Sequence, residues 1–518
     1  MTVTPASTTD PATMSASPPP VRSLARLLEG LAQLPRDVEI ADLTQDGRAA
    51  RPGAAFLAVR GSAEHGLAYA PQAVANGARA VLWEPASIAV VPDLPSEILV
   101  APVPHLREHV SLIADRFFDA PSQELAVAGV TGTNGKTTCA YLLAQALDAA
   151  NRPAAYMGTI GTGRPGRLTP SALTTGDAVT VQRTLAGFRA GGARHVAMEV
   201  SSHAIDQARV GAVRFRTAAF TNLTRDHLDY HGSMDSYGAT KARLFTRAEL
   251  QSRVINVDDA FGRQLALDPR GRGRLVLTSR GHPHQARNAA GFVRAMSVRL
   301  STRGIELEFD SSWGTGALSC PLVGDFNVDN VLTVLAVLLD WEIPLDDALR
   351  VLSVVQAAPG RMETFGGTAA PLVIVDYAHT PDALRKALAA ARAHCPGRLI
   401  AVFGCGGDRD PGKRPMMGAI AAELADDVVI TDDNPRTEAP DAIVADIAAG
   451  IPAGKPFRVE HDRGAAIRAA IAMAGDADVV VVAGKGHEDY QVYGRERRAF
   501  SDQAVVRAAL APRAGGAA

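Results

Sequence analysis

A glycine-rich segment with a single lysine offers the clearest chemistry in this chain. It follows an apolar run at residues 125–130, precedes a helix-like pattern, and comprises Gly132, Thr133, Asn134, Gly135, Lys136, Thr137 and Thr138. Backbone N–H groups of such a turn, followed by a helix N-terminus, bind phosphate oxygens. We expect Lys136 to reach the β- and γ-phosphates of ATP and the Thr137 hydroxyl to ligate Mg²⁺. The alternative is a glycine-rich turn with a stray lysine, because the first glycine of the usual P-loop is replaced here by Val130.

Three more side chains are candidates for chemistry near such a nucleotide. Glu199 ends the apolar run "VAME", where an exposed carboxylate supplies the hard oxygen that Mg²⁺ prefers. His227 in "TRDHLDYHG" is a second candidate near the metal, although a lone histidine after a strand is more often structural. Lys241 in "YGATKARLF" is, on its own, an ordinary solvated helix lysine. Cys139 falls in the first turn of the helix after the loop, and we interpret it as a small core residue.

Four polar clusters in the last third of the chain each follow directly on a short apolar run. They occupy residues 376–379, 404–409, 432–436 and 484–488, after the runs "PLVIVD", "LIAVFG", "DVVIT" and "DVVVVA". Ligands bind at the carboxyl ends of strands in a parallel sheet. One such cluster alone is as well explained by turn chemistry. Four together, with Arg, His and Glu among them, favour a binding site.

The elements that must position these residues alternate between short β-type runs and Ala-rich helical patterns. This alternation indicates an α/β fold with largely parallel sheets. We predict three domains, with a central P-loop ATPase-type parallel sheet and a C-terminal Rossmann-like sheet. The predicted boundaries are a disordered tail at 1–22, an N-terminal domain at 23–120, a central domain at 121–355 and a C-terminal domain at 356–518.

Composition excludes several classes of protein. The chain has 518 residues, 47% of them hydrophobic and 21% charged, and a formal net charge of −2. A general affinity for nucleic acid or an anionic membrane is therefore not expected. Apolar runs do not reach the ~18 residues that span a bilayer, and "VLTVLAVLLDW" is expected to be a buried helix. Four widely spaced cysteines without a CxxC pair fit a reducing cytoplasm.

Seven motifs then point to a family: "GTNGKTT", "MEVSSH", "NLTRDHLDYHG", "GDFNVDN", "APGRME", "DYAHTPDAL" and "GKGHE". Together, and in this order, they resemble the motifs of the Mur ligases of bacterial cell-wall synthesis, over roughly residues 40–500. The resemblance implies a ligase that uses ATP and Mg²⁺ to add meso-2,6-diaminopimelate to UDP-N-acetylmuramoyl-L-alanyl-D-glutamate (UDP-MurNAc-L-Ala-D-Glu) through an acyl phosphate. It also implies a cytoplasmic enzyme, which we expect to be a monomer.

The resemblance assigns roles to individual residues. It implies a carbamylated Lys241 as a metal ligand beside Thr137, Glu199 and His227, and catalytic roles for Lys136, Lys241 and His227. Further ATP contacts are implied for Asn327, Arg361, Asp376 and His379. The UDP-sugar peptide is expected at Gly47, Thr174, Thr175, Ser201, Gln207 and Arg209. Two departures from the family's pattern lie here, because Leu173 stands where relatives commonly have Asn and Gly47 where they have Ser.

The motif "DNPR" bears on which amino acid is added. Diaminopimelate ends in an amine and a carboxylate, and the planar fork of Arg436 suits that carboxylate. The implied diaminopimelate contacts are Arg409, Asp433, Asn434, Pro435, Arg436, Gly484 and Glu488. A lysine-adding ligase, a folylpolyglutamate-synthase-like ligase and a P-loop regulatory ATPase remain as alternatives.

Overall fold

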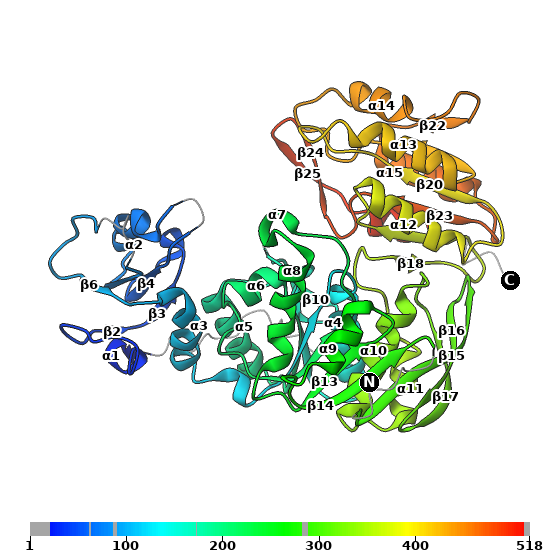
Figure 1. The fold of residues 1–518 in the computed structure, drawn as a ribbon. Coiled ribbons are helices and arrows are strands. Elements are labelled where there is room, and N and C mark those ends of the chain that lie inside the picture. Colours follow the sequence, from blue (N-terminus) through cyan, green and yellow to red (C-terminus); the bar gives the residue numbers. More distant parts are fainter. Residues whose placement is uncertain (1–20, 62–63, 86–90, 172, 282–288, 512–518) are drawn as a thin grey trace, which may run out of the picture. The chain divides into compact units, whose positions relative to one another are not determined.

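The computed structural model describes residues 21–61, 64–85, 91–171, 173–281 and 289–511 (Figure 1). The predicted N-terminal tail lies outside these residues up to position 20, and Arg22 already belongs to strand β1 (Arg22–Ser23), which pairs with β2 (Glu39–Ile40). The described residues form two compact units. The first contains those among residues 21–124, 176–189 and 203–213, and the second contains the other described residues.

The first unit is built on a parallel sheet that has four strands among the described residues. Its order is β3 (Asp42–Thr44), β4 (Ala54–Ala58), β5 (Ala80–Trp83) and β6 (Leu99–Pro102). Apolar residues of α1 (Leu24–Leu27), α3 (Leu106–Phe117) and α5 (Ala178–Ala190) pack with one set of strand residues. Those of α2 (Ala70–Ala75) pack with the alternate set. Both faces of the sheet are therefore covered, as is usual for parallel strands.

The central part of the second unit contains an eleven-stranded sheet, counted over the part of the chain that the structure describes. Its order is β10-β9-β8-β11-β7-β12-β13-β14-β15-β16-β17, with parallel pairing from β8 to β15 and antiparallel hairpins at both ends. The strands are β7 (Ala126–Thr131), β8 (Ala154–Gly158), β9 (Gly161–Arg164), β10 (Arg167–Thr169), β11 (His195–Glu199), β12 (Phe215–Phe220), β13 (Ser252–Asn256), β14 (Arg274–Ser279), β15 (Gly291–Ser301), β16 (Gly304–Ser311) and β17 (Gly314–Cys320). The predicted antiparallel pattern at residues 292–310 is confirmed by β15 and β16.

Helices of this part include α4 (Lys136–Ala149), α7 (Leu228–His231), α8 (Met234–Ala242), α9 (Ala260–Leu267), α10 (Asn327–Asp340) and α11 (Leu345–Leu352), whereas α6 (Ser202–Asp206) lies almost entirely in the first unit. Helix α10 is the predicted buried helix. It packs against α4 and strands β13 to β15, and its residues are buried almost all round. A helix that is apolar on every side belongs in a core. No helix among the described residues is long and apolar enough to cross a membrane.

The C-terminal part of the second unit has its own sheet, six-stranded over the described residues. Its order is β18 (Glu363–Phe365), β19 (Leu372–Asp376), β23 (Val479–Ala483), β20 (Leu399–Phe403), β21 (Asp427–Ile430) and β22 (Phe457–Val459). All but the edge strand β18 run parallel. Two further strands, β24 (Tyr490–Tyr493) and β25 (Glu496–Ala499), form a separate hairpin.

Helices cover both faces of this C-terminal sheet. Helices α12 (Pro381–Arg392), α13 (Lys413–Leu424) and α14 (Pro440–Ala448) pack with strand residues such as Ile374 and Val481. Helices α15 (Arg463–Met473) and α16 (Asp502–Leu510) pack with the alternate set, which includes Val375 and Val480. Strands buried on both faces require continuous apolar runs, and the four predicted strands have them. The predicted α/β class and Rossmann-like C-terminal sheet are confirmed.

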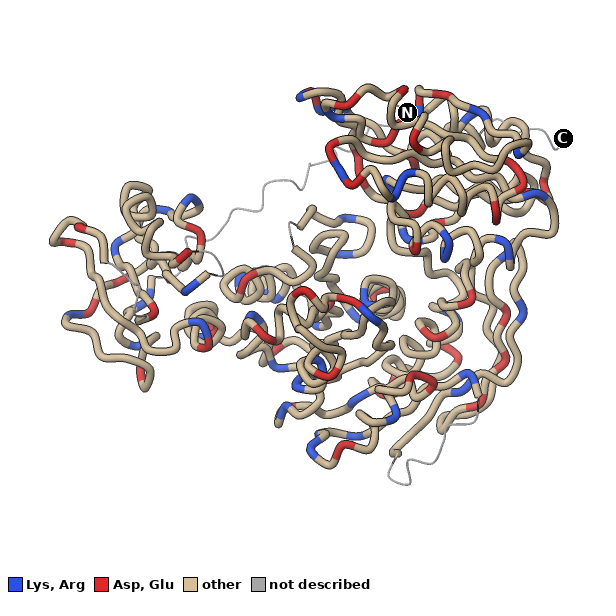
Figure 2. Tube along the Cα trace, turned by 45° about the horizontal axis from the view of Figure 1, so that its top comes forward, with Lys and Arg blue, Asp and Glu red and all other residues tan. Residues whose placement is uncertain are grey.

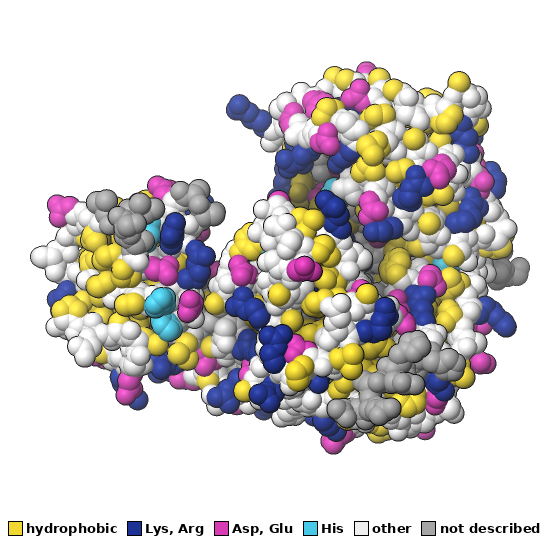
Figure 3. All heavy atoms as spheres, viewed as in Figure 1, with side chains coloured by type: hydrophobic (Ala, Val, Ile, Leu, Met, Phe, Trp, Pro, Cys, Tyr) yellow, Lys and Arg dark blue, Asp and Glu magenta, His cyan; other side chains and the backbone are white. Residues whose placement is uncertain are grey.

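Basic and acidic side chains are interspersed along the described residues (Figure 2). On the face drawn in Figure 3 they alternate with apolar and uncharged side chains over both units.

Candidate active site

The predicted phosphate loop lies between β7 and α4 and is closely packed from behind. Gly132 and Gly135 have φ angles of +151° and +84°. A Cβ on Gly132 would lie 2.0 Å from Oγ1 of Thr221, and one on Gly135 would lie 2.4 Å from Oδ1 of Asn330. Both positions therefore require glycine for conformation and for space.

Two lysines, the half-buried Lys136 and the buried Lys241, converge on one carbonyl oxygen of this loop. Nζ of Lys136 donates to the carbonyl oxygens of Gly132 (3.0 Å) and Thr133 (2.8 Å), and Nζ of Lys241 donates to Gly132 (2.9 Å). Burial lowers the pKa of Lys136. Burial, and then the charge of Lys136, lower the pKa of Lys241 to about 6. Lys241, 1% exposed, is thus not the solvated lysine that its local sequence indicates.

Glu199 lies at the end of β11 as predicted but is buried rather than exposed, and it is fixed through both carboxylate oxygens. Oε2 accepts a hydrogen bond from Oγ1 of Thr137 (2.9 Å). Oε1 accepts from the Tyr156 hydroxyl (2.5 Å) and from the backbone N–H of Thr159 (2.8 Å). Burial, followed by Glu199, raises the pKa of Tyr156. Tyr156 and Thr159 are supporting residues that the motifs did not identify.

The donor set at Thr137 and Glu199 fits Mg²⁺. A hydroxyl and a carboxylate oxygen lie side by side, and Mg²⁺ usually takes one or two such protein ligands, keeping several waters. Within the described residues there is no cluster of three or more His, Cys, Asp or Glu side chains that would form a closed metal cage. A sparsely liganded, water-rich ion is therefore the kind of metal that these residues suit.

The loop opens onto a cavity of about 260 Å³. The lining consists of Thr133, Asn134, Gly135, Lys136, Thr137, Thr138, Thr159, Thr174, Glu199 and Arg361. Arg361 comes from the turn before β18, and its guanidinium lies 5.3 Å from the centroid of the Tyr377 ring. The structure thus brings the predicted loop, Glu199 and Arg361 together at one cavity.

Three other residues predicted at the nucleotide are not among the residues that line this cavity. Asp376 accepts hydrogen bonds from the backbone N–H groups of Met362 (2.8 Å) and Ala378 (2.9 Å). His379 packs edge-on against Tyr377, with ring centroids 4.6 Å apart. His227 has a left-handed backbone just before α7, and its exposed ring lies 6.0 Å from that of Tyr237.

Asn327 is connected to the phosphate loop through hydrogen bonds with neighbouring side chains. Its side chain donates to the Val323 carbonyl (2.7 Å) and accepts from Asn330 (2.8 Å). Asn330 in turn accepts from the Cys139 thiol (3.2 Å) behind Gly135. Burial raises the pKa of Cys139, so the interpretation of this thiol as a core residue agrees with its surroundings.

The residues expected at the UDP-sugar peptide fall in both units. In the first unit, a Cβ on Gly47 would lie 2.8 Å from the Tyr69 carbonyl oxygen, so the glycine here is required by packing. Arg209 donates through Nε (3.0 Å) and Nη2 (2.6 Å) to Oε1 of Gln207.

In the second unit, the predicted threonine pair connects to Glu199. Oγ1 of Thr175 donates to the Glu199 carbonyl oxygen (2.9 Å) and accepts from the Ser201 N–H (3.2 Å). Oγ1 of Thr159 donates to Thr174 (3.0 Å).

The four polar clusters of the C-terminal sheet lie at one edge, because β19, β20, β21 and β23 are parallel. The clusters after β21 and β23 meet there although β20 separates the two strands. Gly404, at the end of β20, allows the crossing, since a Cβ on it would lie 2.0 Å from the Thr431 carbonyl oxygen. Nη1 of Arg436 donates to the Gly407 carbonyl (2.7 Å), which joins the clusters after β20 and β21.

Polar side chains hold the cluster after β21 in place. Asn434 donates to Oε2 of Glu488 (3.1 Å), while Gly484 has a φ of +120° and no room for a Cβ, which would lie 2.5 Å from Oδ2 of Asp433. Pro435 is buried, and Arg409 is exposed on the cluster after β20. The structure therefore places the predicted diaminopimelate residues at one sheet edge.

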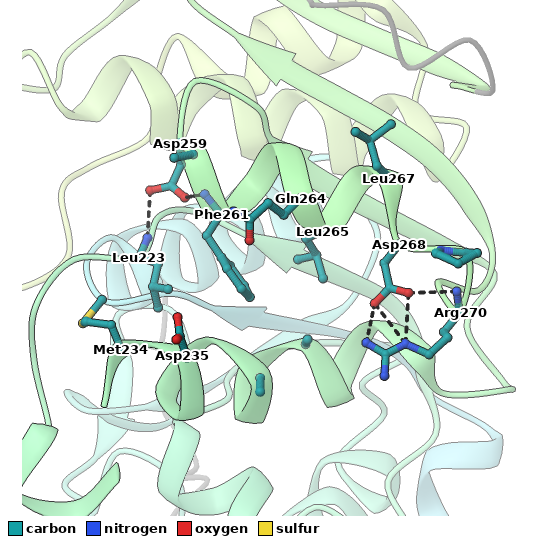
Figure 4. A pocket seen from close by; sticks show the side chains of 14 residues that line it. Leu223, Met234, Asp235, Asp259, Phe261, Gln264, Leu265, Leu267, Asp268 and Arg270 are labelled. Atoms are coloured by element: carbon teal, nitrogen blue, oxygen red, sulfur yellow. Dashed lines mark hydrogen bonds and ion pairs between the residues drawn. The ribbon is translucent and has the colours of Figure 1, made fainter. Parts of the chain in front are cut away.

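A larger cavity, of about 590 Å³, lies between α8 and α9 (Figure 4). Two of its carboxylates have partners: Asp259 accepts from the N–H groups of Leu223 (3.0 Å) and Phe261 (2.8 Å), and Asp268 pairs with Arg270 (2.8 Å). None of the predicted site residues is among the described residues that line this cavity.

Comparison with known proteins decides the family. Three family models match: "Mur ligase family, catalytic domain" at residues 39–118, "Mur ligase middle domain" at 130–338 and "Mur ligase, glutamate ligase domain" at 360–486. A relative from Xanthomonas campestris pv. campestris is 49% identical over 496 residues, covering 95% of this chain and 98% of its own. The chain belongs to the Mur ligase family.

Several similar Mur ligases share one name. The Xanthomonas protein and one from Pseudomonas aeruginosa, 48% identical over 92% of this chain and 96% of its own, are both UDP-N-acetylmuramoyl-L-alanyl-D-glutamate–2,6-diaminopimelate ligases. A solved structure of the same name has a TM-score of 0.71 and 33% identity, covering 95% of this chain and 99% of its own. A Mycobacterium tuberculosis folylpolyglutamate synthase, at 18% identity, TM-score 0.54, 72% of this chain and 91% of its own, shares the fold. The three-domain α/β prediction is confirmed, while the exact domain boundaries stay a prediction.

Proposed function

We propose that this Mur ligase uses ATP to join 2,6-diaminopimelate to UDP-MurNAc-L-Ala-D-Glu. The observation that carries the proposal is the shared name of relatives that are 48–49% identical over more than nine-tenths of the chain. The site fits that reaction, since a phosphate loop opens onto a cavity and a charged sheet edge carries Arg436. Both features lie in the second unit.

The chemistry needs an activated carboxylate. Transfer of the γ-phosphoryl group of ATP to the D-Glu carboxylate gives an acyl phosphate and ADP. The amine of the incoming amino acid attacks that carbonyl, loses a proton, and expels phosphate as the amide bond forms. The protein contributes positioning and charge neutralisation. Lys136 exchanges its contacts with the loop carbonyls for the transferred phosphate, and Arg361 supplies a second cation at the same cavity.

Thr137 and Glu199 would hold Mg²⁺, which supplies neutralisation of the phosphate charge when bound. Tyr156 and Thr159 keep the Glu199 carboxylate oriented toward Thr137. His227 stays a proposed contributor from the exposed side of the loop.

Lys241 is proposed to carry a carbamate. The reaction with CO₂ needs the neutral amine, and a pKa of about 6 makes that the main form at neutral pH. Nucleophilic addition of the neutral amine to CO₂ forms the N–C bond, releases one proton and gives an anion. Lys241→Ala should abolish activity, and ¹³C NMR with labelled bicarbonate should lose one carbamate signal in that variant. Full activity of Lys241→Ala would remove the idea.

Binding of the UDP-sugar peptide is proposed for Gly47, Gln207 and Arg209 in the first unit, and for Thr174, Thr175 and Ser201 in the second. Arg209 has the donor geometry to pair with a carboxylate or a phosphate.

Phosphate release tests the function. The assay contains ATP, Mg²⁺ and UDP-MurNAc-L-Ala-D-Glu, and adds diaminopimelate, L-lysine or neither. We expect release only when the sugar peptide and diaminopimelate are both present. Phosphate release with L-lysine but not with diaminopimelate, in the presence of the sugar peptide, would identify a lysine-adding enzyme. Release without the sugar peptide would indicate a regulatory ATPase, and folylpolyglutamate-type activity would require a folate acceptor instead.

A further inference from the structure

Lys485 is a fully buried lysine in the middle of the charged sheet edge, with 0% of its surface exposed. Its Nζ donates to Oε2 of Glu488 (3.0 Å) and to Oδ1 of Asn434 (3.2 Å), and lies 4.0 Å from Oδ1 of Asp433. The ammonium also lies 5.3 Å from the centroid of the Tyr490 ring. One cation therefore contacts three of the residues predicted to bind the amino acid.

These contacts join two loops that do not follow neighbouring strands. Asp433 and Asn434 follow β21, whereas Lys485 and Glu488 follow β23, with β20 between them. Asn434 donates to the same Oε2 of Glu488 (3.1 Å) that Lys485 contacts. The N–H of Val492 donates to Oδ1 of Asn434 (3.0 Å), so the start of the β24–β25 hairpin is tied to the same group. The Lys485 ammonium and the direct hydrogen bond between Asn434 and Glu488 together hold these two side chains in place.

The net charge at this sheet edge depends on two carboxylates and the Lys485 ammonium. Asp433 and Glu488 are two carboxylates in a largely buried setting, and repulsion between them would be strong without a cation. Lys485 neutralises one of the two, while the other buried cation nearby, Arg463, is paired with Asp502 (2.7 Å). What remains for a ligand is one net negative charge, beside the guanidinium of Arg436. A substrate group with one ammonium and one carboxylate matches that remainder.

We propose that Lys485 is a positioning and specificity-determining residue for the amino-acid substrate. It holds Glu488 and Asn434 in register and limits the site to one uncompensated negative charge, so that a zwitterionic end is preferred over a plain cation. The inference rests on the proposed function and deepens it. Lys485 acts through Glu488 and Asn434.

The test compares Lys485→Met with Lys386→Met, an exposed lysine of α12 paired with Asp382. For each protein, KM and kcat are measured for diaminopimelate, L-lysine, ATP and the sugar peptide. We expect Lys485→Met to lower kcat/KM for diaminopimelate by on the order of 10²-fold, with KM for ATP and for the sugar peptide within about threefold. The ratio of diaminopimelate to lysine use should fall by about tenfold or more, because the variant leaves a second carboxylate uncompensated. Lys386→Met should match the wild type.

A double-mutant cycle with Glu488→Gln separates positioning from general support of the fold. The two substitutions should be non-additive in kcat/KM for diaminopimelate by about tenfold or more, since each removes the same contact. If Lys485→Met does not fold, Lys485→Arg is measured in the same cycle, because its larger planar head displaces Glu488 while keeping the charge. Additive effects, or equal losses for all substrates, would overturn the inference. A wild-type enzyme without diaminopimelate-dependent phosphate release would instead refute the proposed function.

Discussion

The hydroxyl of Tyr156 donates a hydrogen bond of 2.5 Å to Oε1 of Glu199, while Oε2 of the same carboxylate accepts from Thr137. Tyr156 lies on β8, the strand that pairs with β11, so the sheet itself aims the phenol at the carboxylate. Glu199 is therefore oriented before any nucleotide binds.

Tyr156→Phe should weaken metal binding and leave the fold intact. Removing a partner that orients a metal ligand typically costs about 10–100-fold in affinity. The Mg²⁺ concentration for half-maximal activity, and Mn²⁺ binding followed by electron paramagnetic resonance, should both shift by that order. Tyr69→Phe, which removes an exposed hydroxyl bonded to Glu64 (2.9 Å), is the control. Unchanged metal dependence in Tyr156→Phe would contradict this role.

Gly135→Ala should damage both stability and activity. A left-handed conformation costs a residue with a Cβ about 1–2 kcal/mol, and the new methyl group would also meet Asn330. Gly166→Ala is a matched control, because Gly166 has a φ of +82° with nothing within 4 Å of its Cβ position. Both variants should lower the urea midpoint, whereas only Gly135→Ala should impair ATP binding in calorimetry. Normal ATP affinity in Gly135→Ala would mean that the loop tolerates the side chain.

Arg436→Lys should impair the use of diaminopimelate much more than the use of ATP. Lysine keeps the charge but loses the planar fork that pairs with a carboxylate. Loss of a buried charge-pair contact costs ~2–5 kcal/mol, so kcat/KM for diaminopimelate should fall on the order of 10²-fold or more. Arg385→Lys, at an exposed arginine paired with Glu423 (2.8 Å), serves as the control. Equal losses for ATP and diaminopimelate would argue against the assignment.

His394 should make the second unit less stable in mild acid. Its Nε2 accepts from the Gly324 N–H (3.0 Å) and its Nδ1 donates to the Ser301 carbonyl (2.6 Å), which requires a neutral ring. Burial lowers its pKa below 6.5. As the pH falls below 6.5, the unfolded chain takes up a proton that the folded ring does not, so stability falls until the lowered folded pKa is reached.

Urea unfolding at several pH values between about 7.5 and about 5 checks this slope. The stability advantage of wild type over His394→Gln should shrink as the pH falls. His461 has the opposite effect on stability. Asp432 raises the pKa of His461, so the stabilisation from the protonated ring is lost as the pH rises through that pKa. A constant difference between wild type and His394→Gln would exclude the neutral-ring requirement.

The sequence predicts the C-terminal sheet well because its strands are buried on both faces. Runs such as "PLVIVD" and "DVVVVA" have no other plausible structure between two helices, and the polar clusters follow them at once. The phosphate loop is equally predictable, since Gly132, Gly135 and Lys136 are needed at fixed spacing for both conformation and charge.

The supporting residues were not predictable in the same way. Tyr156 lies in "AAYMG", which looks like any core strand, and its partner Glu199 is 43 residues away. Lys485 lies in a glycine-rich turn, where a lysine normally indicates solvent. Lys485 is buried because the loop after β21, which follows a different strand, packs against it. Long-range partners of this kind leave no local signal, and Lys241 shows the same limitation.

Cys139 illustrates a further consequence of the packing behind the phosphate loop. Its thiol is buried and donates to Asn330, and burial raises the pKa of Cys139, Cys320, Cys395 and Cys405 alike. The reactive thiolate form of these cysteines is therefore scarce in the second unit. We expect the buried Cys139 thiol to react slowly with peroxide and maleimides, so that covalent inhibitors of the nucleotide pocket would need a target other than this sulfur.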